Sequence, residues 1–252
     1  MRRVFITGAG SGLGAALARH YGSAGATLGL LGRRRGALEE SARGLDARLY
    51  AVDVGDAAAV ALAAQDFIAH AGCPDIVIAS AGISVGALAL ERDDLEVFRA
   101  SFATNVLGVL HTFQPFIAPM QAARRGCLCG IASVAGVRGL PGGGAYSASK
   151  AALVTWLESL RLELAGGGIS VVTVSPGYID TPMTRVNPYP MPFRLSAEQA
   201  ARKVAHAIAR RRRHAVIPWQ MALAARALRC MPDVWYDRLF AGAPRKPRGL
   251  PL

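Results

Sequence analysis

Short apolar runs alternate along the chain with longer stretches in which apolar residues recur at helical spacing. We predict strands at Val4–Thr7, Thr27–Leu31, Arg48–Val52, Asp75–Ala79, Cys127–Ala132, Ile169–Val174 and Ala215–Pro218. Between them we predict helices at Gly12–Ser23, Gly36–Gly44, Asp56–Ala71, Asp93–Ala122, Tyr146–Leu164 and Ser196–Arg212. This alternation is typical of βαβ units, so it predicts an α/β fold with a doubly wound, seven-stranded parallel sheet and helices on both faces.

No internal repeat or linker divides the 252 residues, so we expect a single domain over residues 1–252. Its core would span about residues 3–218, and residues 219–252 would form a basic, amphipathic, helical C-terminal extension. The proline-rich segment Pro176–Leu195 lies where a lid over a crevice at the strand ends would lie. We expect the last residues, Ala243–Leu252, to fray.

The first predicted strand runs directly into a glycine-rich stretch, TGAGSGLG, at Thr7–Gly14. Glycines at a strand-to-helix turn let backbone N–H groups approach a pyrophosphate, and the helix N-terminus adds partial positive charge. The natural frame is T-G-x-x-x-G-x-G, with Gly8, Gly12 and Gly14. A turn that binds nothing would not explain three glycines in one turn, so we favour a dinucleotide-binding loop.

The end of the second predicted strand indicates which dinucleotide such a loop would bind. Sites for NAD place a carboxylate there, which binds the ribose 2′-hydroxyl. Here the sequence reads LGRRR, and the guanidinium of Arg33 or Arg34 could pair with a 2′-phosphate. We therefore favour NADP(H), with NAD(H) as the alternative. A simpler interpretation is that these arginines are only the exposed first turn of the next helix.

Asp53 and Val54 follow the third predicted strand. The Asp53 carboxylate could accept a hydrogen bond from an adenine amino group, with Val54 against the ring. It could equally cap a turn. The residues alone leave both interpretations open.

Tyr146 and Lys150 share one helix face, because they are four residues apart in YSASK. An ammonium beside a phenol favours the phenolate and lowers the pKa of the phenol, which makes tyrosine a usable acid or base near neutral pH. The chain has 26 arginines and only three lysines, so a lysine at this position is notable. A compact ammonium differs in its chemistry from a rigid guanidinium fork.

Ser133 and Asn105 are two further candidates. Ser133 ends the fifth predicted strand, at the sheet edge where ligands bind in such folds, and its hydroxyl could hold a substrate oxygen or merely cap a turn. Asn105 interrupts a predicted helix, although asparagine is a poor helix former. It could relay a proton through water to Lys150 or form only local hydrogen bonds.

Seven motifs together resemble the classical short-chain dehydrogenase/reductase family, in their order and approximate spacing over residues 3–183. They are TGAGSGLG, Asp53–Val54, ASAG at Ala79–Gly82, NVLG at Asn105–Gly108, IASVAG with Ser133, YSASK, and SPGYIDTPM at Ser175–Met183. The resemblance implies a Rossmann-like fold and hydride transfer between a nicotinamide and an alcohol or carbonyl carbon.

The resemblance also implies roles for individual residues. Tyr146 would be the acid or base, and Ser133 would position the substrate oxygen. Lys150 would lower the pKa of the tyrosine and hold the nicotinamide ribose, while Asn105 would complete a proton relay. The cofactor would further be lined by Ser11, Leu13 and Gly82, and the nicotinamide would be contacted by the loop that holds Pro176, Gly177, Ile179 and Thr181.

The chain departs from the family pattern after the fourth strand. The family's N-N-A-G is here Ala79, Ser80, Ala81 and Gly82. The missing asparagines brace the sheet and the loop in the family. Ser80 could replace one of their hydrogen bonds, so the departure puts local bracing in doubt more than the chemistry. We keep Ser80 and Ala81 among the expected cofactor contacts.

The net charge of +12 is concentrated near the C-terminus, where residues 196–252 hold 12 Lys and Arg against 3 Asp and Glu. A nucleic-acid binder is disfavoured, because no recognised module and no basic groove with interleaved aromatics is present. Residues 218–240 are amphipathic, with tryptophans among arginines. We favour a helical hairpin that covers the crevice or packs on a second subunit over contact with an anionic membrane surface.

Other features limit the function further. No apolar run approaches the roughly 20 residues of a membrane span. The four cysteines match no zinc or redox motif, so we expect no metal site and a reducing, cytoplasmic location. The family resemblance implies a homodimer or homotetramer.

The sequence therefore predicts an NADP(H)-dependent oxidoreductase. It would interconvert a secondary alcohol and a ketone, with a fairly apolar small molecule as substrate. The residues that select it would lie in Val134–Ala145 and Tyr178–Leu195. The alternative is a non-catalytic NADP-binding sensor of the same fold, which would have no need of an intact Ser133, Tyr146 and Lys150.

Overall fold

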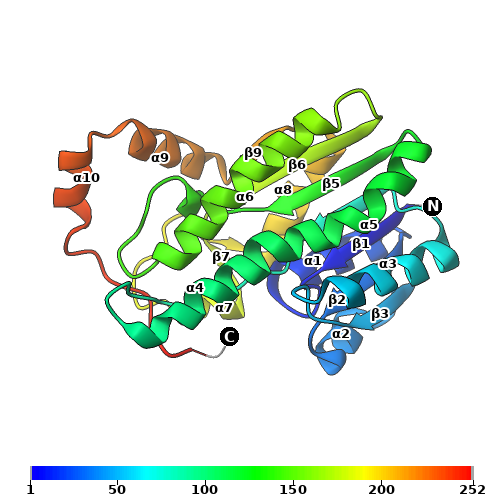
Figure 1. Ribbon diagram of the computed structural model, residues 1–252, viewed down its shortest axis with the longest axis horizontal. Helices are drawn as coiled ribbons and strands as arrows, with labels where there is room; N and C mark the ends of the chain where they lie inside the picture. Colours follow the sequence, from blue (N-terminus) through cyan, green and yellow to red (C-terminus); the bar gives the residue numbers. More distant parts are fainter. Residues whose placement is uncertain (1, 251–252) are drawn as a thin grey trace.

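The computed structural model describes residues 2–250. Its main sheet has seven parallel strands in the order β3-β2-β1-β4-β5-β6-β9. Most of these strands are labelled in Figure 1. The strands are β1 Arg3–Thr7, β2 Thr27–Gly32, β3 Ala47–Ala51, β4 Ile76–Ala79, β5 Gly126–Ile131, β6 Ile169–Pro176 and β9 His214–Ile217. The predicted doubly wound parallel sheet is confirmed.

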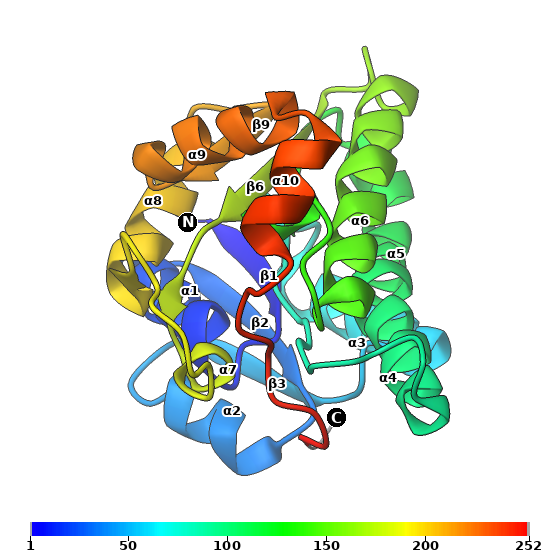
Figure 2. The same ribbon diagram turned by 90° about the vertical axis from the view of Figure 1, so that its left-hand side faces the viewer.

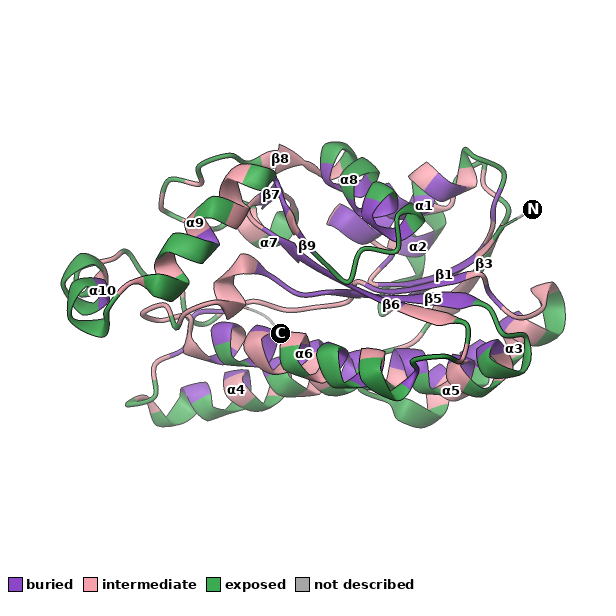
Figure 3. Cartoon of the chain, turned by 90° about the horizontal axis from the view of Figure 1, so that it is seen from above, coloured by how far each residue is buried: buried purple, intermediate pink, exposed green. Residues whose placement is uncertain are grey.

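The helices cover both faces of this sheet, with α1, α2 and α8 on one side and α3, α5 and α6 on the other (Figure 3). Their bounds are α1 Gly12–Gly22, α2 Arg35–Ser41, α3 Ala57–Ala71, α4 Leu95–Phe102, α5 Gly108–Ala122, α6 Gly144–Glu163, α7 Pro182–Arg185, α8 Ala197–Ala209, α9 Trp219–Cys230 and α10 Asp233–Phe240. Two short strands, β7 Ile179–Asp180 and β8 Leu195–Ser196, pair with each other near the two ends of the segment that we expect to form a lid.

The central strands are apolar at successive positions because both of their faces are covered. Ile6 belongs to a buried cluster with residues of α1 and α8. Its neighbour Phe5 points to the other face, where its ring lies 4.9 Å from that of Phe116 in α5 and 5.5 Å from that of Phe67 in α3. Apolar packing on both faces therefore fixes the position of the sheet between its two layers of helices.

The strand order reverses at β1, which pairs with β2 on one side and β4 on the other. The chain continues from β1 to α1 on one face of the sheet and from β4 to α4 on the other (Figure 3). Ligands of open α/β sheets bind in the crevice formed there, outside the carboxyl ends of the strands. The glycine-rich stretch follows β1 and lies at this reversal.

The prediction of one helix over residues 93–122 is wrong in its details. A 3-10 turn at Arg92–Asp94 precedes α4, and a π-helical turn at Ala103–Leu107 joins α4 to α5. Asn105 lies in this π turn and is fully buried. Gly108 follows, and a Cβ there would lie 2.7 Å from the Val54 side chain, so the helix packs closely on the loop after β3.

The C-terminal extension contains α9 and α10, with Pro232 as the cap residue between them. From α10 the chain runs back across the molecule towards α4 (Figure 2). The expectation that residues 243–252 fray is wrong for the part that the structure describes: the Pro247 carbonyl accepts a 3.0 Å hydrogen bond from the Gly86 amide, and Arg248 pairs with Asp94. Residues 251 and 252 lie outside the described residues.

Candidate active site

A cavity of about 710 Å³ lies at the carboxyl ends of the strands, within the 300–1,000 Å³ typical of ligand pockets. Of the predicted site residues, only Asn105 does not line it. Those that line it are Gly8, Ser11, Gly12, Leu13, Gly14, Arg33, Arg34, Asp53, Val54, Ser80, Ala81, Gly82, Ser133, Tyr146, Lys150, Pro176, Gly177, Ile179 and Thr181. Segments far apart in the sequence therefore meet in one crevice.

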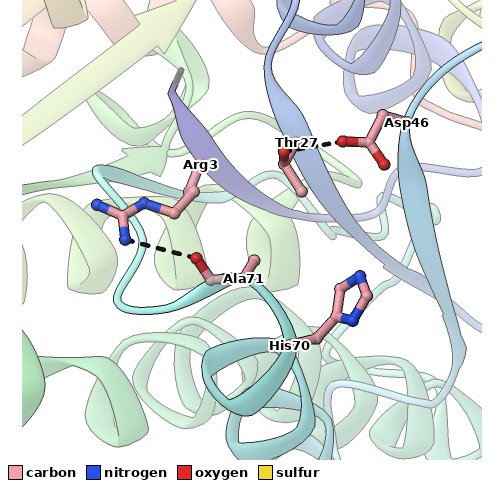
Figure 4. A pocket seen from close by; sticks show the side chains of 5 residues that line it. All are labelled: Arg3, Thr27, Asp46, His70 and Ala71. Atoms are coloured by element: carbon pink, nitrogen blue, oxygen red, sulfur yellow. Dashed lines mark hydrogen bonds between the residues drawn. The ribbon is translucent and has the colours of Figure 1, made fainter.

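A second hollow, of about 400 Å³, lies at the amino ends of the strands (Figure 4). The Arg3 guanidinium donates a 3.4 Å hydrogen bond to the Ala71 carbonyl there, and the Thr27 hydroxyl donates a 2.8 Å hydrogen bond to Asp46. It is lined by these residues and His70. Arg3 and Asp46 are already hydrogen-bonded there, and none of the predicted site residues lines this hollow, so we place the candidate site at the other edge.

The glycine loop approaches other backbone too closely for side chains. A Cβ at Gly8 would lie 2.6 Å from the Ala81 nitrogen, and one at Gly14 would lie 2.2 Å from the Gly8 oxygen. Gly8 and Gly12 also adopt φ values of +69° and +54°, which favour glycine. The loop therefore packs directly on the segment after β4 and on the first turn of α1.

The N-terminus of α1 suits an anion. Its cap residue, Ser11, makes no side-chain hydrogen bond to the first turn, and no acidic residue lies in that turn. The first N–H groups of a helix have no partner within the helix and carry partial positive charge. This cradle fits the pyrophosphate of a dinucleotide, as the motif predicts.

Arg33 and Arg34 lie at the end of β2 and line the same cavity. The Arg33 guanidinium is 4.0 Å from the Asp53 carboxylate, and both side chains are about half exposed. The other Asp53 oxygen accepts a 2.8 Å hydrogen bond from the Gly55 amide. Asp53 thus caps a turn, which is one of the two roles that the sequence left open. It also lines the cavity, so the other role, a hydrogen bond to an adenine, is still sterically available.

Tyr146 lies in the first turn of α6, and Ser133 lies two residues after the end of β5. Ser133 is nearly buried, and its oxygen accepts a 3.1 Å hydrogen bond from the Ala135 amide. Burial raises the pKa of Tyr146, and a hydrogen bond with Ser133 opposes this increase. The two hydroxyl groups are therefore placed together at the cavity wall.

Lys150 is buried one turn further along α6. Its ammonium donates a 2.8 Å hydrogen bond to the Ile131 carbonyl and lies 5.8 Å from the centre of the Tyr146 ring. Burial lowers the pKa of Lys150 to about 8. The pKa of Tyr146 is raised overall, opposite to the predicted effect of the ammonium, because the burial of the phenol outweighs its hydrogen bond with Ser133.

Asn105 lies behind the cavity wall instead of in it. Its amide nitrogen donates 3.0 Å hydrogen bonds to the Ile83 carbonyl and the Ser149 hydroxyl, and its oxygen accepts a 2.9 Å hydrogen bond from the Ile83 amide. These are the local hydrogen bonds that the sequence left as one option. Asn105 thus braces the loop after β4, where the family's own asparagines are missing.

The loop after β6 packs against the glycine loop. A Cβ at Gly12 would lie 3.0 Å from the Thr181 methyl group. The Thr181 amide donates a 3.1 Å hydrogen bond to the Thr184 hydroxyl, which caps the short helix α7. On the other side, Met221 of α9 packs against Gly177. This loop is therefore positioned from both sides over the crevice.

Sequence reasoning missed part of the wall. The apolar residues among the additional lining positions include Ile83, Val85, Met183, Val186 and Leu250. Met183 and Val186 fall in Tyr178–Leu195, where the sequence predicts residues that select the substrate. Nothing in the sequence pattern connects Leu250 with this site, whose other lining residues all lie more than 60 positions earlier in the chain. The sequence instead predicts that Leu250 belongs to a frayed C-terminal tail.

Comparison with known proteins is consistent with this geometry. Residues 2–189 match the family model of short chain dehydrogenases. An uncharacterised oxidoreductase of Myxococcus xanthus is 36% identical over 94% of this chain and 95% of its own. A 2-dehydro-3-deoxy-L-rhamnonate dehydrogenase (NAD(+)) of Sphingomonas is 34% identical over 72% of this chain and 74% of its own. A short chain dehydrogenase/reductase of Burkholderia phymatum, solved in complex with NAD, has a TM-score of 0.80 at 26% identity over 99% of this chain and 98% of its own.

The fold and the cavity define a Rossmann-like oxidoreductase that uses NAD(P). The chain belongs to the short-chain dehydrogenase/reductase family. Within residues 2–250, no three His, Cys, Asp or Glu side chains group so as to hold a metal ion. In the same residues, no helix has both the length and the apolar character needed to cross a membrane.

Replacing Asn105 tests its bracing role. Asn105→Ala leaves the Ile83 amide and carbonyl without these partners, so we expect the free energy of unfolding to fall by about 1–3 kcal/mol. We also expect faster hydrogen exchange at the Ile83 amide. Urea unfolding and exchange followed by NMR measure both. Gln114→Ala, at an exposed amide of α5, is the matched control, and unchanged exchange at Ile83 in Asn105→Ala would contradict the assignment.

Proposed function

We propose that this oxidoreductase is NADP(H)-dependent and interconverts a secondary alcohol and a ketone in a fairly apolar small molecule. The observation that carries the proposal is that Tyr146, Ser133 and Lys150 line the same cavity as the glycine loop. A binding protein that only senses the nucleotide would not need a buried ammonium one turn from a partly buried phenol. We also propose that residues 1–252 act as one domain, because residues 3–217 supply the strands of a single sheet.

The residues of the chain would divide the chemistry among them. Bound NADP(H) supplies or accepts the hydride. In reduction, the Tyr146 hydroxyl donates its proton to the carbonyl oxygen, while the Ser133 hydroxyl holds that oxygen in place. The Lys150 ammonium stabilises the phenolate that remains. Oxidation of the alcohol runs through the same groups in reverse.

Asn105 would contribute chiefly by holding the loop after β4 against α6. Its side chain binds Ile83 and Ser149, and Ser149 in turn donates a 2.8 Å hydrogen bond to the Tyr146 carbonyl. These hydrogen bonds connect the helix turn that holds Tyr146 with the loop after β4. The proton relay that the family resemblance implies for Asn105 stays a prediction.

The choice of NADP(H) rests on charge at the end of β2. Arg33 and Arg34 line the cavity there, and a guanidinium can pair with a 2′-phosphate. Asp53, which lies 4.0 Å from Arg33, keeps NAD(H) as the alternative. The Sphingomonas relative is named for NAD(+), and the Burkholderia structure contains NAD, so family membership does not itself decide the cofactor.

An apolar substrate is supported by apolar residues in the wall of the cavity that Ser133 and Tyr146 also line, among them Val85, Val186 and Leu250. We further propose a homodimer or homotetramer. Exposed apolar side chains on α4, the π turn and α5 support it, since such residues are often covered in assemblies. They are Leu95, Phe102, Leu107 and Leu110. A cytoplasmic location stays a prediction.

Removing the phenol hydroxyl tests the mechanism. Tyr146→Phe should lower kcat by about 100- to 10,000-fold, because the carbonyl oxygen loses its proton donor. NADPH binding, followed by the change in its fluorescence, should survive. Tyr50→Phe, whose hydroxyl binds Asp66 outside the cavity, is the control and should keep its activity. Normal turnover by Tyr146→Phe would refute the assignment.

Arg33→Ala tests the cofactor preference. Loss of a charge-assisted contact to the 2′-phosphate should raise the KM for NADPH by about 10- to 100-fold and leave the KM for NADH nearly unchanged. Arg35→Ala is the matched control, because Arg35 pairs with Glu39 on α2 and does not line the cavity. Equal changes for both cofactors, or an original preference for NADH, would overturn the role of Arg33.

The buried ammonium predicts a pH dependence. Burial lowers the pKa of Lys150 to about 8, so its charge is present below that pH and lost above it. Burial raises the pKa of Tyr146, so its proton is retained over the same range. We expect kcat/KM for ketone reduction to fall as the pH rises through about 8.

Steady-state rates from pH 6 to 10 measure this profile. Burial also lowers the pKa of Lys246 to about 8, so a second lysine must be distinguished from the first. Lys246→Met should leave the midpoint of the profile in place, whatever its effect on the rate. A flat profile, or a midpoint that disappears in Lys246→Met, would exclude Lys150 as the titrating group.

A further inference from the structure

Residues 243–250, which we call the C-terminal strap, run from α10 towards α4 (Figure 2). Leu250, at the end of the strap, lines the cavity. They have no regular secondary structure, and their position must come from their contacts. The strap meets three segments that border the cavity: the loop after β4, the start of α6 and the loop after β6. These contacts connect the end of the chain with the place where a substrate would bind.

The middle of the strap is held by polar contacts. The Pro247 carbonyl accepts a 3.0 Å hydrogen bond from the Gly86 amide. The Lys246 ammonium donates a 2.9 Å hydrogen bond to the Ser84 hydroxyl and a 3.3 Å hydrogen bond to the Met183 carbonyl. Ser84 and Met183 both line the cavity. Lys246 therefore joins two walls of the crevice through the strap.

An ion pair fixes the strap near its end. The Arg248 guanidinium donates a 2.7 Å hydrogen bond to the Asp94 carboxylate, and Glu91 lies 3.4 Å from the same guanidinium. Asp94 is 6% exposed and also accepts a 2.8 Å hydrogen bond from the Leu88 amide. A buried carboxylate that loses its cationic partner is costly, so this pair favours one position of the strap.

Leu250 follows two residues later and lines the cavity. Its side chain packs on a small buried cluster that contains Val85, Val97 and Ala145. Ala145 immediately precedes Tyr146, and Val85 also lines the cavity. Leu250 thus forms part of the apolar wall beside the helix turn that holds the candidate proton donor.

We propose that Leu250 determines substrate size at this site, and that the Arg248–Asp94 pair is the positioning contact that holds it there. This inference rests on the proposed alcohol–ketone chemistry. The wall contributed by Leu250 limits the volume available to the substituents of the carbonyl carbon, so the site selects compact, apolar ketones. A bulkier ketone fits only when the side chain at position 250 is smaller or the strap is released.

The specificity test uses the full-length protein, NADPH and two aryl ketones, acetophenone and the bulkier benzophenone. Leu250→Ala should raise the ratio of kcat/KM for benzophenone to that for acetophenone by about tenfold or more, the range that small volume changes in an apolar pocket produce. Leu250→Trp should lower the ratio. Leu239→Ala, at an exposed leucine of α10, is the matched control and should leave it unchanged.

The positioning test does not depend on activity. In Arg248→Ala, hydrogen exchange at the Gly86 amide should become at least about tenfold faster, because the Pro247 carbonyl no longer stays against it. Arg248→Lys should restore part of the protection and part of the size selectivity. Arg226→Ala, at an exposed arginine of α9, controls for the loss of one positive charge.

The outcomes separate this inference from the proposed function. If Leu250→Ala reduces ketones but keeps the original ratio, the role of Leu250 is overturned and the proposed function stands. Unchanged exchange at Gly86 in Arg248→Ala overturns the positioning role of the ion pair. If the native protein reduces neither ketone with NADPH or NADH, both the proposed ketone chemistry and the role of Leu250 are overturned. The exchange data still decide whether the ion pair holds the strap.

Discussion

The backbone of the glycine loop lies directly against the backbone of the loop after β4, and the rest of the site depends on this approach. A Cβ at Gly8 would lie 2.6 Å from the Ala81 nitrogen, so any side chain there would push the two loops apart. They follow β1 and β4, the neighbouring strands at which the sheet order reverses. Because all seven strands run in parallel, the loops after β5 and β6 reach the same edge. The close contact between these two loops and the parallel orientation of the strands thus bring the lining residues together.

The buried charge of Lys150 is the main electrostatic feature of that edge. Removing an ammonium from water is unfavourable, and a single 2.8 Å hydrogen bond to the Ile131 carbonyl offsets only part of the cost, which is why the pKa falls to about 8. Lysine suits this role better than arginine, since its pKa responds to burial while that of arginine does not. The same desolvation raises the pKa of Tyr146, so phenol and ammonium are both moved towards their neutral forms.

The shape of the crevice is decided by segments that lie late in the chain. The helices α9 and α10 both contact the loop that follows β5, where the Arg138 guanidinium binds the carbonyls of Leu228 and Met231 and lies over the Tyr236 ring. None of the residues of α9 and α10 lines the cavity, so the predicted covering of the crevice stays a prediction. Trp219 of α9 and Trp235 of α10 are largely exposed, and the chain then returns as the strap. The extension thus borders the site in two different ways.

The sequence by itself determined the doubly wound parallel sheet and the cluster of glycine, serine, tyrosine and lysine at its edge, because these follow from local periodicity, from the order of the motifs and from i, i+4 spacing. Only the tertiary structure decided that Asn105 braces a loop from a π turn and that Leu250 reaches the cavity. A π turn depends on what the buried side chain finds to bind, here the backbone of Ile83. The strap is held by Arg248 and by a carboxylate 154 residues earlier, and such long-range contacts leave no period in the sequence.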